Sequence, residues 1–141
     1  VGIDISSEAL KIASYNASRH KVRDKIRFYK KSIDEYSNEK FDLIVSNPPY
    51  IKKSEIKNLD TTVRYFEPKI ALDGGNDGLD VIRKVIYKSK DILKIKGMLA
   101  LEIGNEQIKK VSKILIDNNF RIKHVIRDYK TNVRCVFAYF N

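Results

Sequence analysis

The sequence has one cysteine, Cys135, and no apolar run of the length needed to cross a bilayer. A single cysteine excludes a disulfide within the chain and offers no metal-ligand spacing. No stretch resembles a signal peptide, and there is no internal repeat or low-complexity tract. We therefore expect a soluble globular protein of a reducing, cytoplasmic compartment, without a metal site and without a membrane partner.

The sequence also lacks an initiator methionine, and its first residues already read as the middle of a strand. We therefore expect a piece of a longer protein. Its length of 141 residues is enough for one domain with a real core, and no interdomain linker is visible. Residues 1–141 are thus predicted to form a single, partial domain.

Acidic residues are in the minority, with 18 Asp and Glu against 28 Lys and Arg, and the net charge is +10. Clustered cations would favour a polyanionic partner. Here they are spread from Lys11 to Arg134 without a dominant block, so a solvated basic surface is the simpler interpretation. A ribosome-associated or RNA-containing target stays open.

Apolar periodicity predicts alternating strands and helices. Strands are predicted at residues 1–5, 26–32, 41–46, 98–103, 120–128 and 132–140, and helices at residues 7–17, 78–96 and 108–118. Ser6 or Ser7 is the expected N-cap of the first helix, whose apolar face would hold Ala9, Leu10, Ile12, Ala13 and Ala17. Gly97 is expected to end the second helix.

This alternation predicts an α/β fold with a doubly wound, mostly parallel sheet and a C-terminal antiparallel hairpin. Residues 41–46 are apolar enough to be buried on both faces of such a sheet. Residues 51–78 show no clean period, and an irregular segment of this length is typical of a functional loop. Ligands of such folds bind beyond the carboxyl ends of the strands, where Asp4, Ser32, Asn47 and Glu102 fall.

Asp4 follows a short strand and precedes a helix. Nucleotide-binding α/β folds place a carboxylate there to accept both ribose hydroxyls. An acidic side chain near a helix N-terminus is an equally good interpretation of this residue alone.

The stretch Asn47-Pro48-Pro49-Tyr50 follows the most apolar strand. Two prolines stiffen the backbone and remove two N–H donors. The Asn47 side-chain oxygen and the Pro48 carbonyl can then each accept one N–H of a substrate NH₂ group, while Tyr50 offers a flat face. We interpret this stretch as a clamp for an amide or an exocyclic amine, although a proline-rich turn that merely ends a strand would look similar.

With the preceding Ser46, this stretch resembles the (D/N)PP(Y/F) motif of class I S-adenosylmethionine-dependent methyltransferases that methylate planar nitrogen groups. Further similarity lies in VRYFEPKIALDGGNDGLDVIRKVI, in GMLALEIGNEQ, and in Asp128 with Arg134. Together they resemble the HemK/PrmC family of release factor glutamine methyltransferases over essentially the whole chain. The FEP..AL..G.DGLD segment is the most diagnostic, because nucleic-acid methyltransferases with NPPY do not usually carry it.

The resemblance implies that the cofactor is S-adenosylmethionine and that the substrate is the glutamine of a Gly-Gly-Gln motif in a class I peptide chain release factor. Asn47, Pro48 and Tyr50 would be catalytic. Asp4, Ile5, Ile33, Asp34 and Asn47 would bind the cofactor, and Asn47, Pro48, Pro49, Tyr50 and Glu67 the substrate.

Neighbouring residues are expected to play supporting roles. Arg64, Phe66 and Pro68 would help Glu67 to shape the loop over the glutamine, although Glu67 is as well explained by pairing with Arg64 or capping a turn. Glu102 and Gln107 would organise a strand-to-helix corner. We predict turn roles for Gly74, Gly75 and Gly78, and surface positions for His20 and His124.

The pattern departs from the family in one respect. The glycine-rich cofactor loop of the D-x-G-x-G-x-G type is not in this sequence, nor are the strand before it and the N-terminal helical domain. We therefore predict that residues 1–141 alone bind S-adenosylmethionine poorly. Two alternatives stay open: an amino-methyltransferase acting on adenine or guanine of DNA or rRNA, and a non-catalytic binding module with a degenerate cofactor site.

Overall fold

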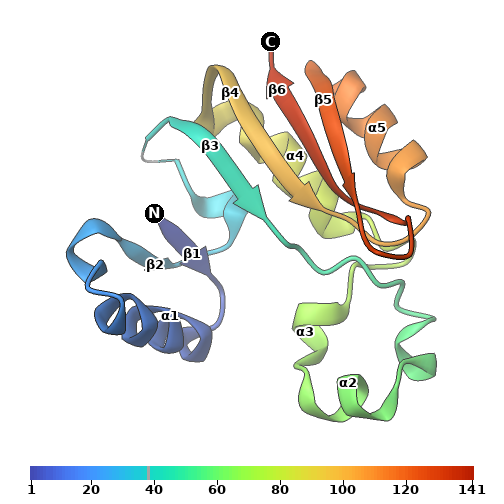
Figure 1. Ribbon diagram of the computed structural model, residues 1–141, viewed down its shortest axis with the longest axis horizontal. Coiled ribbons are helices and arrows are strands. Elements are labelled where there is room, and N and C mark those ends of the chain that lie inside the picture. Colours follow the sequence, from blue (N-terminus) through green and yellow to red (C-terminus); the bar gives the residue numbers. More distant parts are fainter. Residues whose placement is uncertain (38) are drawn as a thin grey trace. The chain divides into compact units, whose positions relative to one another are not determined.

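The computed structural model describes residues 1–37 and 39–141 of the chain. They fall into two compact units, Val1–Asn38 and Glu39–Asn141, and each unit is described by itself (Figure 1).

The first unit is built on a pair of parallel strands. Its elements are β1 (Gly2–Asp4), α1 (Ser7–Arg19), η1 (Arg23–Lys25), β2 (Phe28–Lys30) and η2 (Ile33–Glu35). Asp4 pairs with Lys30, and the Lys31 N–H donates to the Asp4 carbonyl at 3.1 Å. The two strands therefore end at the same edge of this small sheet.

Helix α1 begins where the sequence predicts. The Ser6 hydroxyl accepts the Ala9 N–H at 3.2 Å and caps the helix. The predicted apolar face is only partly correct: Ala17 is buried, but Ile12 is 62% exposed. Strand β2 is shorter than predicted because Ile26 still belongs to the turn that closes η1.

The second unit holds a four-stranded sheet in the order β3-β4-β6-β5. Its elements are β3 (Phe41–Ser46), η3 (Ile56–Asn58), α2 (Thr61–Phe66), α3 (Lys69–Leu72), α4 (Asp80–Ile92), β4 (Leu93–Glu102), α5 (Ile108–Asp117), β5 (Phe120–Arg127) and β6 (Val133–Phe140). Strands β3 and β4 are parallel, whereas β6 is antiparallel to both β4 and β5. The predicted terminal hairpin is confirmed.

Helices α4 and α5 lie together behind the four-stranded sheet (Figure 1). Their apolar residues recur every three or four positions, so each helix buries one stripe against the strands. The core formed in this way contains Ile82, Val85, Ile86, Ile92, Leu99, Leu101, Ile103, Val111, Leu115, Phe120, Val136 and Ala138.

Strand β3 is not buried on both faces as predicted. It is the edge strand of its sheet, with Leu43 49% and Val45 73% exposed. Their register partners are Met98 and Ala100, so both side chains point to the face opposite the helix-side core residue Leu99. The strand propensity was correct, but burial depends on neighbours that a single strand does not specify. Instead of one sheet, the described residues form a two-stranded and a four-stranded sheet.

The second predicted helix also ends earlier than expected. Helix α4 stops at Ile92, and Gly97 lies within β4. Between Phe41 and Leu43, β3 advances two residues while β4 advances from Leu93 to Met98, so β4 bulges there. A side chain at Gly97 would approach the Lys94 carbonyl oxygen at 2.8 Å, which explains the glycine as part of the bulge rather than as a helix stop.

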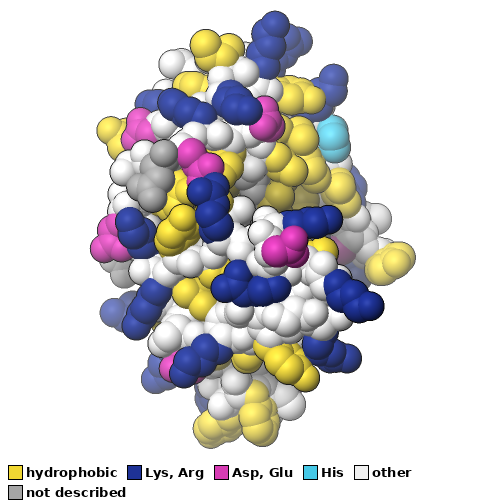
Figure 2. Space-filling model, turned by 90° about the vertical axis from the view of Figure 1, so that its left-hand side faces the viewer, with side chains coloured by type: hydrophobic (Ala, Val, Ile, Leu, Met, Phe, Trp, Pro, Cys, Tyr) yellow, Lys and Arg dark blue, Asp and Glu magenta, His cyan; other side chains and the backbone are white. Residues whose placement is uncertain are grey.

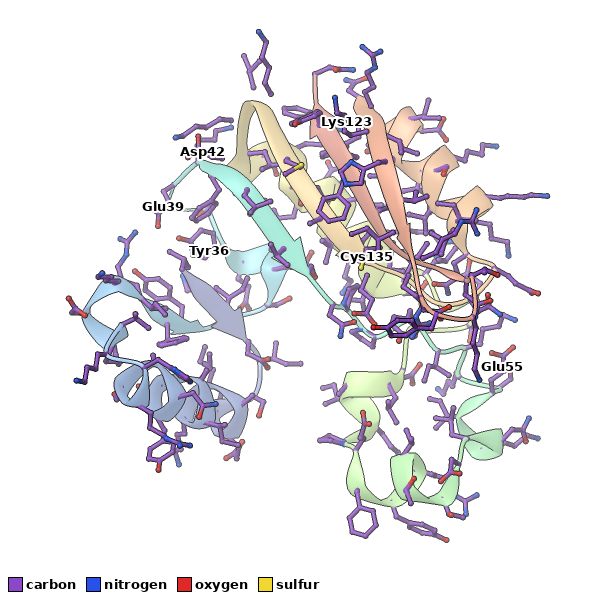
Figure 3. All side chains as sticks on the ribbon, in the orientation of Figure 1. Tyr36, Glu39, Asp42, Glu55, Lys123 and Cys135 are labelled. Carbon is purple, nitrogen blue, oxygen red and sulfur yellow. The ribbon has the colours of Figure 1, made fainter. Side chains whose placement is uncertain are left out.

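Residues 51–78 contain three short helical turns, η3, α2 and α3, which the sequence did not predict. The segment closes on itself, because the Ile51 N–H donates to the Leu72 carbonyl at 3.1 Å and the Gly74 N–H to the Ile51 carbonyl at 2.8 Å. Glu55, on the way to α2 (Figure 3), pairs with Lys52 at 2.6 Å. Among the described helices, none combines the length and apolar character needed to cross a membrane.

Candidate functional site

At the end of β3, two oxygen acceptors have no hydrogen-bond donor among the described residues. Asn47 is exposed. Across residues 1–37 and 39–141, no hydrogen bond uses its side chain or the Pro48 carbonyl. Neither acceptor of the predicted clamp is therefore used by a hydrogen bond within the described residues.

The prolines hold the backbone that carries these acceptors. Pro48 is buried and Pro49 half-buried. Because a proline ring restricts φ, the main chain from Asn47 to Tyr50 has few conformations to choose from. Asn47 is thus an exposed side chain on a stiff, anchored backbone.

Tyr50 is fixed at both its ring and its hydroxyl. Its hydroxyl donates to Glu102 Oε1 at 3.2 Å and accepts from Arg134 Nη2 at 3.3 Å. The Arg134 guanidinium also lies over the ring, 5.7 Å from its centroid. Burial raises the pKa of the Tyr50 phenol, which keeps the hydroxyl protonated as the donor to Glu102. The flat face predicted for substrate stacking stays a prediction.

The contact between Arg134 and Tyr50 was not predicted from the sequence. It lies on β6, 84 residues from Tyr50, and the Ile103 N–H donates to its carbonyl at 2.9 Å. Its guanidinium also approaches Asp128 in the hairpin turn at 3.9 Å. The pairing of β6 with β4, Glu102 opposite Cys135, brings Arg134 beside the end of β4, and register within the hairpin alone does not specify this pairing.

Gln107 occupies the predicted corner between β4 and α5. Its side-chain oxygen accepts the Gly104 N–H at 2.8 Å. The prediction that Gln107 organises this corner is confirmed. Glu102 instead uses its carboxylate on the Tyr50 hydroxyl.

Glu67 closes α2 and is exposed. Its N–H donates to the Val63 carbonyl at 3.0 Å, so it is the C-cap residue of that helix. Arg64 donates instead to the Lys57 carbonyl and to the Tyr65 hydroxyl, and in the described chain it forms no ion pair with Glu67. Phe66 is 85% exposed beside it. The Glu67 carboxylate therefore remains available, and its contact with a substrate stays a prediction.

The other predicted cofactor residues belong to the first unit. Asp4 ends β1 and Ile5 follows it, and Ile33 and Asp34 lie in η2 just beyond β2, so parallel pairing brings both pairs to one edge. The Asp4 Oδ1 accepts the Ser6 N–H at 2.7 Å, whereas its Oδ2 has no partner in the described residues.

The histidines and the other charged side chains are the remaining candidates for a further site among the described residues. Both histidines are exposed as predicted, with His124 stacked on Phe137 at 4.6 Å. No group of three possible metal ligands occurs among the residues that the structure describes. On the face in Figure 2, Lys and Arg side chains are scattered between other groups rather than gathered in one block.

Comparisons with known proteins identify relatives over nearly the whole chain. It is 41% identical over 139 residues to the release factor glutamine methyltransferase of Fusobacterium nucleatum, covering 97% of this chain and 39% of that protein. The enzyme of that name from Clostridium acetobutylicum is 38% identical over 138 residues, covering 96% of this chain and 48% of that protein. The chain belongs to the HemK/PrmC family. The family predicted from the NPPY and FEP segments is confirmed.

A family model and a relative of a different name also match the chain. The family model UPF0020, described as an RMKL-like methyltransferase domain, matches residues 1–63. The ribosomal protein uL3 glutamine methyltransferase of Francisella tularensis is 40% identical over 106 residues, which is 74% of this chain and 33% of that protein. This HemK/PrmC chain thus spans less than half the length of each of these three relatives.

Solved structures confirm the fold. A methyltransferase from Pyrococcus furiosus superposes with a TM-score of 0.71 at 18% identity, covering 99% of this chain and 61% of that one. The ribosomal protein L11 methylase from Lactobacillus delbrueckii gives a TM-score of 0.69 at 21% identity, covering 99% and 56%. The predicted Rossmann-like methyltransferase architecture is therefore correct for this HemK/PrmC chain.

Proposed function

We propose that the protein containing this chain transfers a methyl group from S-adenosylmethionine to the side-chain amide nitrogen of the glutamine in the Gly-Gly-Gln motif of peptide chain release factors. The names of the two relatives with 41% and 38% identity support a release factor glutamine as the substrate. The observation that carries the proposal is the exposed Asn47 beside the Pro48 carbonyl, two acceptors with no hydrogen-bond donor in the described chain.

The two acceptors match the chemistry of a carboxamide. Its nitrogen is a weak nucleophile because the lone pair is delocalised into the carbonyl, so orientation matters more than a strong base. Asn47 Oδ1 and the Pro48 oxygen would each accept one N–H of the substrate amide, which orients the nitrogen and makes it more electron-rich as methyl transfer proceeds. No histidine is required in this scheme.

The Asp4 carboxylate of the first unit is a suitable hydrogen-bond acceptor for the two hydroxyl groups of a ribose. Asp4 ends β1 with one carboxylate oxygen committed to the Ser6 N–H and the other without a partner among the described residues. A carboxylate in this position can accept hydroxyl protons of a nucleoside. Asp4 and Ile5, with Ile33 and Asp34 beyond β2, would hold the cofactor. Bound S-adenosylmethionine supplies an electrophilic methyl group on its sulfonium.

A second candidate substrate is a glutamine of a ribosomal protein. The 40% identity to the uL3 glutamine methyltransferase favours it specifically. The clamp chemistry is the same for both, because Asn47 and Pro48 would recognise a primary carboxamide irrespective of the protein that presents it.

The test is methylation by the full-length protein that contains this chain, with a class I release factor, uL3, DNA and rRNA as competing substrates. We expect a methyl group on the Gly-Gly-Gln glutamine of the release factor. Methylation of uL3 alone would favour the second candidate, transfer only to nucleic acid would reject both, and no transfer at all would favour a binding module.

The first prediction concerns Asn47. Asn47→Leu removes the acceptor while keeping a similar size, and kcat should fall by about a hundredfold or more, as when one positioned hydrogen-bonding group is lost. Asn47→Asp retains an acceptor oxygen and should keep more activity than Asn47→Leu. Steady-state kinetics of the full-length variants check this, and equal kcat values for the leucine variant and the unmodified protein would contradict the clamp.

A further inference from the structure

The Gln107 side chain joins three segments that are far apart in sequence. Its oxygen accepts the Gly104 N–H at 2.8 Å. Its nitrogen donates to the Tyr50 carbonyl at 3.0 Å and to the Gly78 carbonyl at 3.1 Å. One carboxamide thus ties the corner after β4 to the NPPY stretch and to the turn before α4, with both amide protons used.

Three glycines make room for this arrangement. A Cβ at Gly74 would lie 2.8 Å from the Tyr50 Cα and 2.9 Å from the Pro49 carbonyl oxygen. At Gly78, where φ is +76°, it would lie 2.5 Å from the Tyr50 carbonyl oxygen, and at Gly104 it would lie 3.0 Å from Gln107 Oε1. Gly74, Gly78 and Gly104 therefore form a close-packed glycine seat for the Pro49–Tyr50 segment, which for Gly74 and Gly78 goes beyond the predicted turn role.

We propose that Gln107 is a positioning residue that holds the Asn47–Pro48 clamp in register by anchoring the Tyr50 carbonyl on the glycine seat of Gly74, Gly78 and Gly104. This inference rests on the proposed function for its kinetic readout and on the hydrogen bonds of Gln107 for its structural one. Only two prolines lie between Tyr50 and Asn47, and their backbone is stiff. If the Tyr50 main chain moves, the Asn47 and Pro48 acceptors therefore move with it. A displacement of about 1 Å at a reacting group lowers the rate by about a hundredfold.

The experiment uses Gln107→Glu in the full-length protein. The glutamate has the same shape and keeps an acceptor for Gly104, but it replaces the donor to Tyr50 and Gly78 by an oxygen. Gln107→Met, which has a similar length and no charge, is measured in parallel. The matched control is Asn118→Asp, because the Asn118 amide also donates to a backbone carbonyl, that of Ile114 at 2.8 Å, at the end of α5.

We expect kcat to fall by about tenfold to a hundredfold in both Gln107 variants, with KM for the glutamine substrate changed by less than about threefold. Hydrogen–deuterium exchange should be faster for the peptide that spans residues 47–53, where the Ile51 and Lys53 N–H groups are hydrogen-bonded. Asn118→Asp should alter neither readout.

Unchanged exchange in this peptide, or a kcat equal to that of the unmodified protein, would overturn the proposal. So would a uniform rise of exchange over the whole chain, because Gln107 would then support the fold in general. If the unmodified protein methylates no glutamine, the proposed function fails, while local exchange in the Gln107 variants still decides whether Gln107 anchors the NPPY stretch.

Discussion

At the scale of single residues, the candidate substrate-binding group, Asn47, differs from Tyr50, whose contacts fix the backbone nearby. Asn47 is exposed and its side chain has no hydrogen bond to the described residues, whereas Tyr50, three residues later, is bound through its hydroxyl, ring and carbonyl. An exposed polar group on a rigid support has already lost the backbone freedom that binding would otherwise cost. A rigid support of this kind suits a site that acts by orienting the substrate amide nitrogen.

The second prediction tests the support at Tyr50. Tyr50→Phe removes the hydroxyl that joins Glu102 to Arg134, and the free energy of unfolding should fall by about 1 kcal/mol, the usual loss for a hydrogen-bonding group whose partners stay behind. Urea denaturation measures this loss. Tyr129→Phe is the matched control, because Tyr129 is fully exposed and its hydroxyl has no partner among the described residues. Equal stability of the two variants would argue against the Glu102–Tyr50–Arg134 contacts.

At the scale of elements, α4 combines a well-buried stripe with one uncompensated polar group. Ile82, Val85, Ile86 and Ile92 are buried against the sheet, but the fully buried Ser89 hydroxyl has no hydrogen-bond partner among the described groups. Burying an unpaired hydroxyl costs free energy, so the helix is less stable than its apolar pattern implies.

The third prediction follows from Ser89. Ser89→Ala should stabilise the protein by about 1 kcal/mol more than Ser112→Ala on α5 does, because both changes gain the same helix propensity but only the first removes a fully buried, unpaired hydroxyl. Thermal denaturation of both variants gives the difference. No difference between them would mean that the Ser89 hydroxyl is satisfied.

The N-terminal end of α4 carries the clearest acid-sensitive contact. Asp77 pairs with Arg83 and accepts the Leu79 N–H at 3.1 Å. The hydrogen bond from Arg83 is the main reason that the pKa of Asp77 is lowered from 3.8 to about 2. A lowered folded-state pKa means that this stabilisation is present above about pH 3.8 and is lost as the pH falls toward 2.

The fourth prediction is that Asp77→Asn flattens the loss of stability between about pH 4 and pH 2. Because the Asp77 side chain is 39% exposed, solvent screening limits the effect to about 1 kcal/mol or less. Urea denaturation at several pH values measures it. An identical pH dependence in the unmodified protein and the variant would show that Asp77 does not contribute.

At the scale of the whole molecule, four of the five predicted cofactor residues lie in one unit, and the fifth, Asn47, lies with the predicted clamp in the other. Asp4, Ile5, Ile33 and Asp34 lie in Val1–Asn38, whereas Asn47 to Tyr50 lie in Glu39–Asn141. Within each unit, parallel pairing brings its candidate residues to the carboxyl ends of its own strands.

The fifth prediction is that a polypeptide of residues 1–141 binds S-adenosylmethionine weakly. The sequence holds a carboxylate for the ribose at Asp4 but no glycine-rich loop whose backbone amides would meet the methionine moiety. Isothermal titration of this polypeptide should show a dissociation constant weaker than about 1 mM, where the binding free energy is only about −4 kcal/mol. Micromolar binding would contradict this prediction.

The sequence alone was sufficient for features that depend on neighbours along the chain. The Ser6 cap, the strand at residues 41–46 and the terminal hairpin all depend on local propensity or short-range periodicity. These interactions involve residues a few positions apart, so their pattern can be read directly.

Tertiary structure decided what depends on residues far apart in the chain. In the structure, β3 is an edge strand with Val45 exposed, and Gly97 lies in a bulge of β4. Arg134 and Gln107 contact Tyr50 although they lie 84 and 57 positions away in the sequence. Burial and side-chain contacts depend on strand order and register, which are set by the packing of the whole sheet rather than by any one segment.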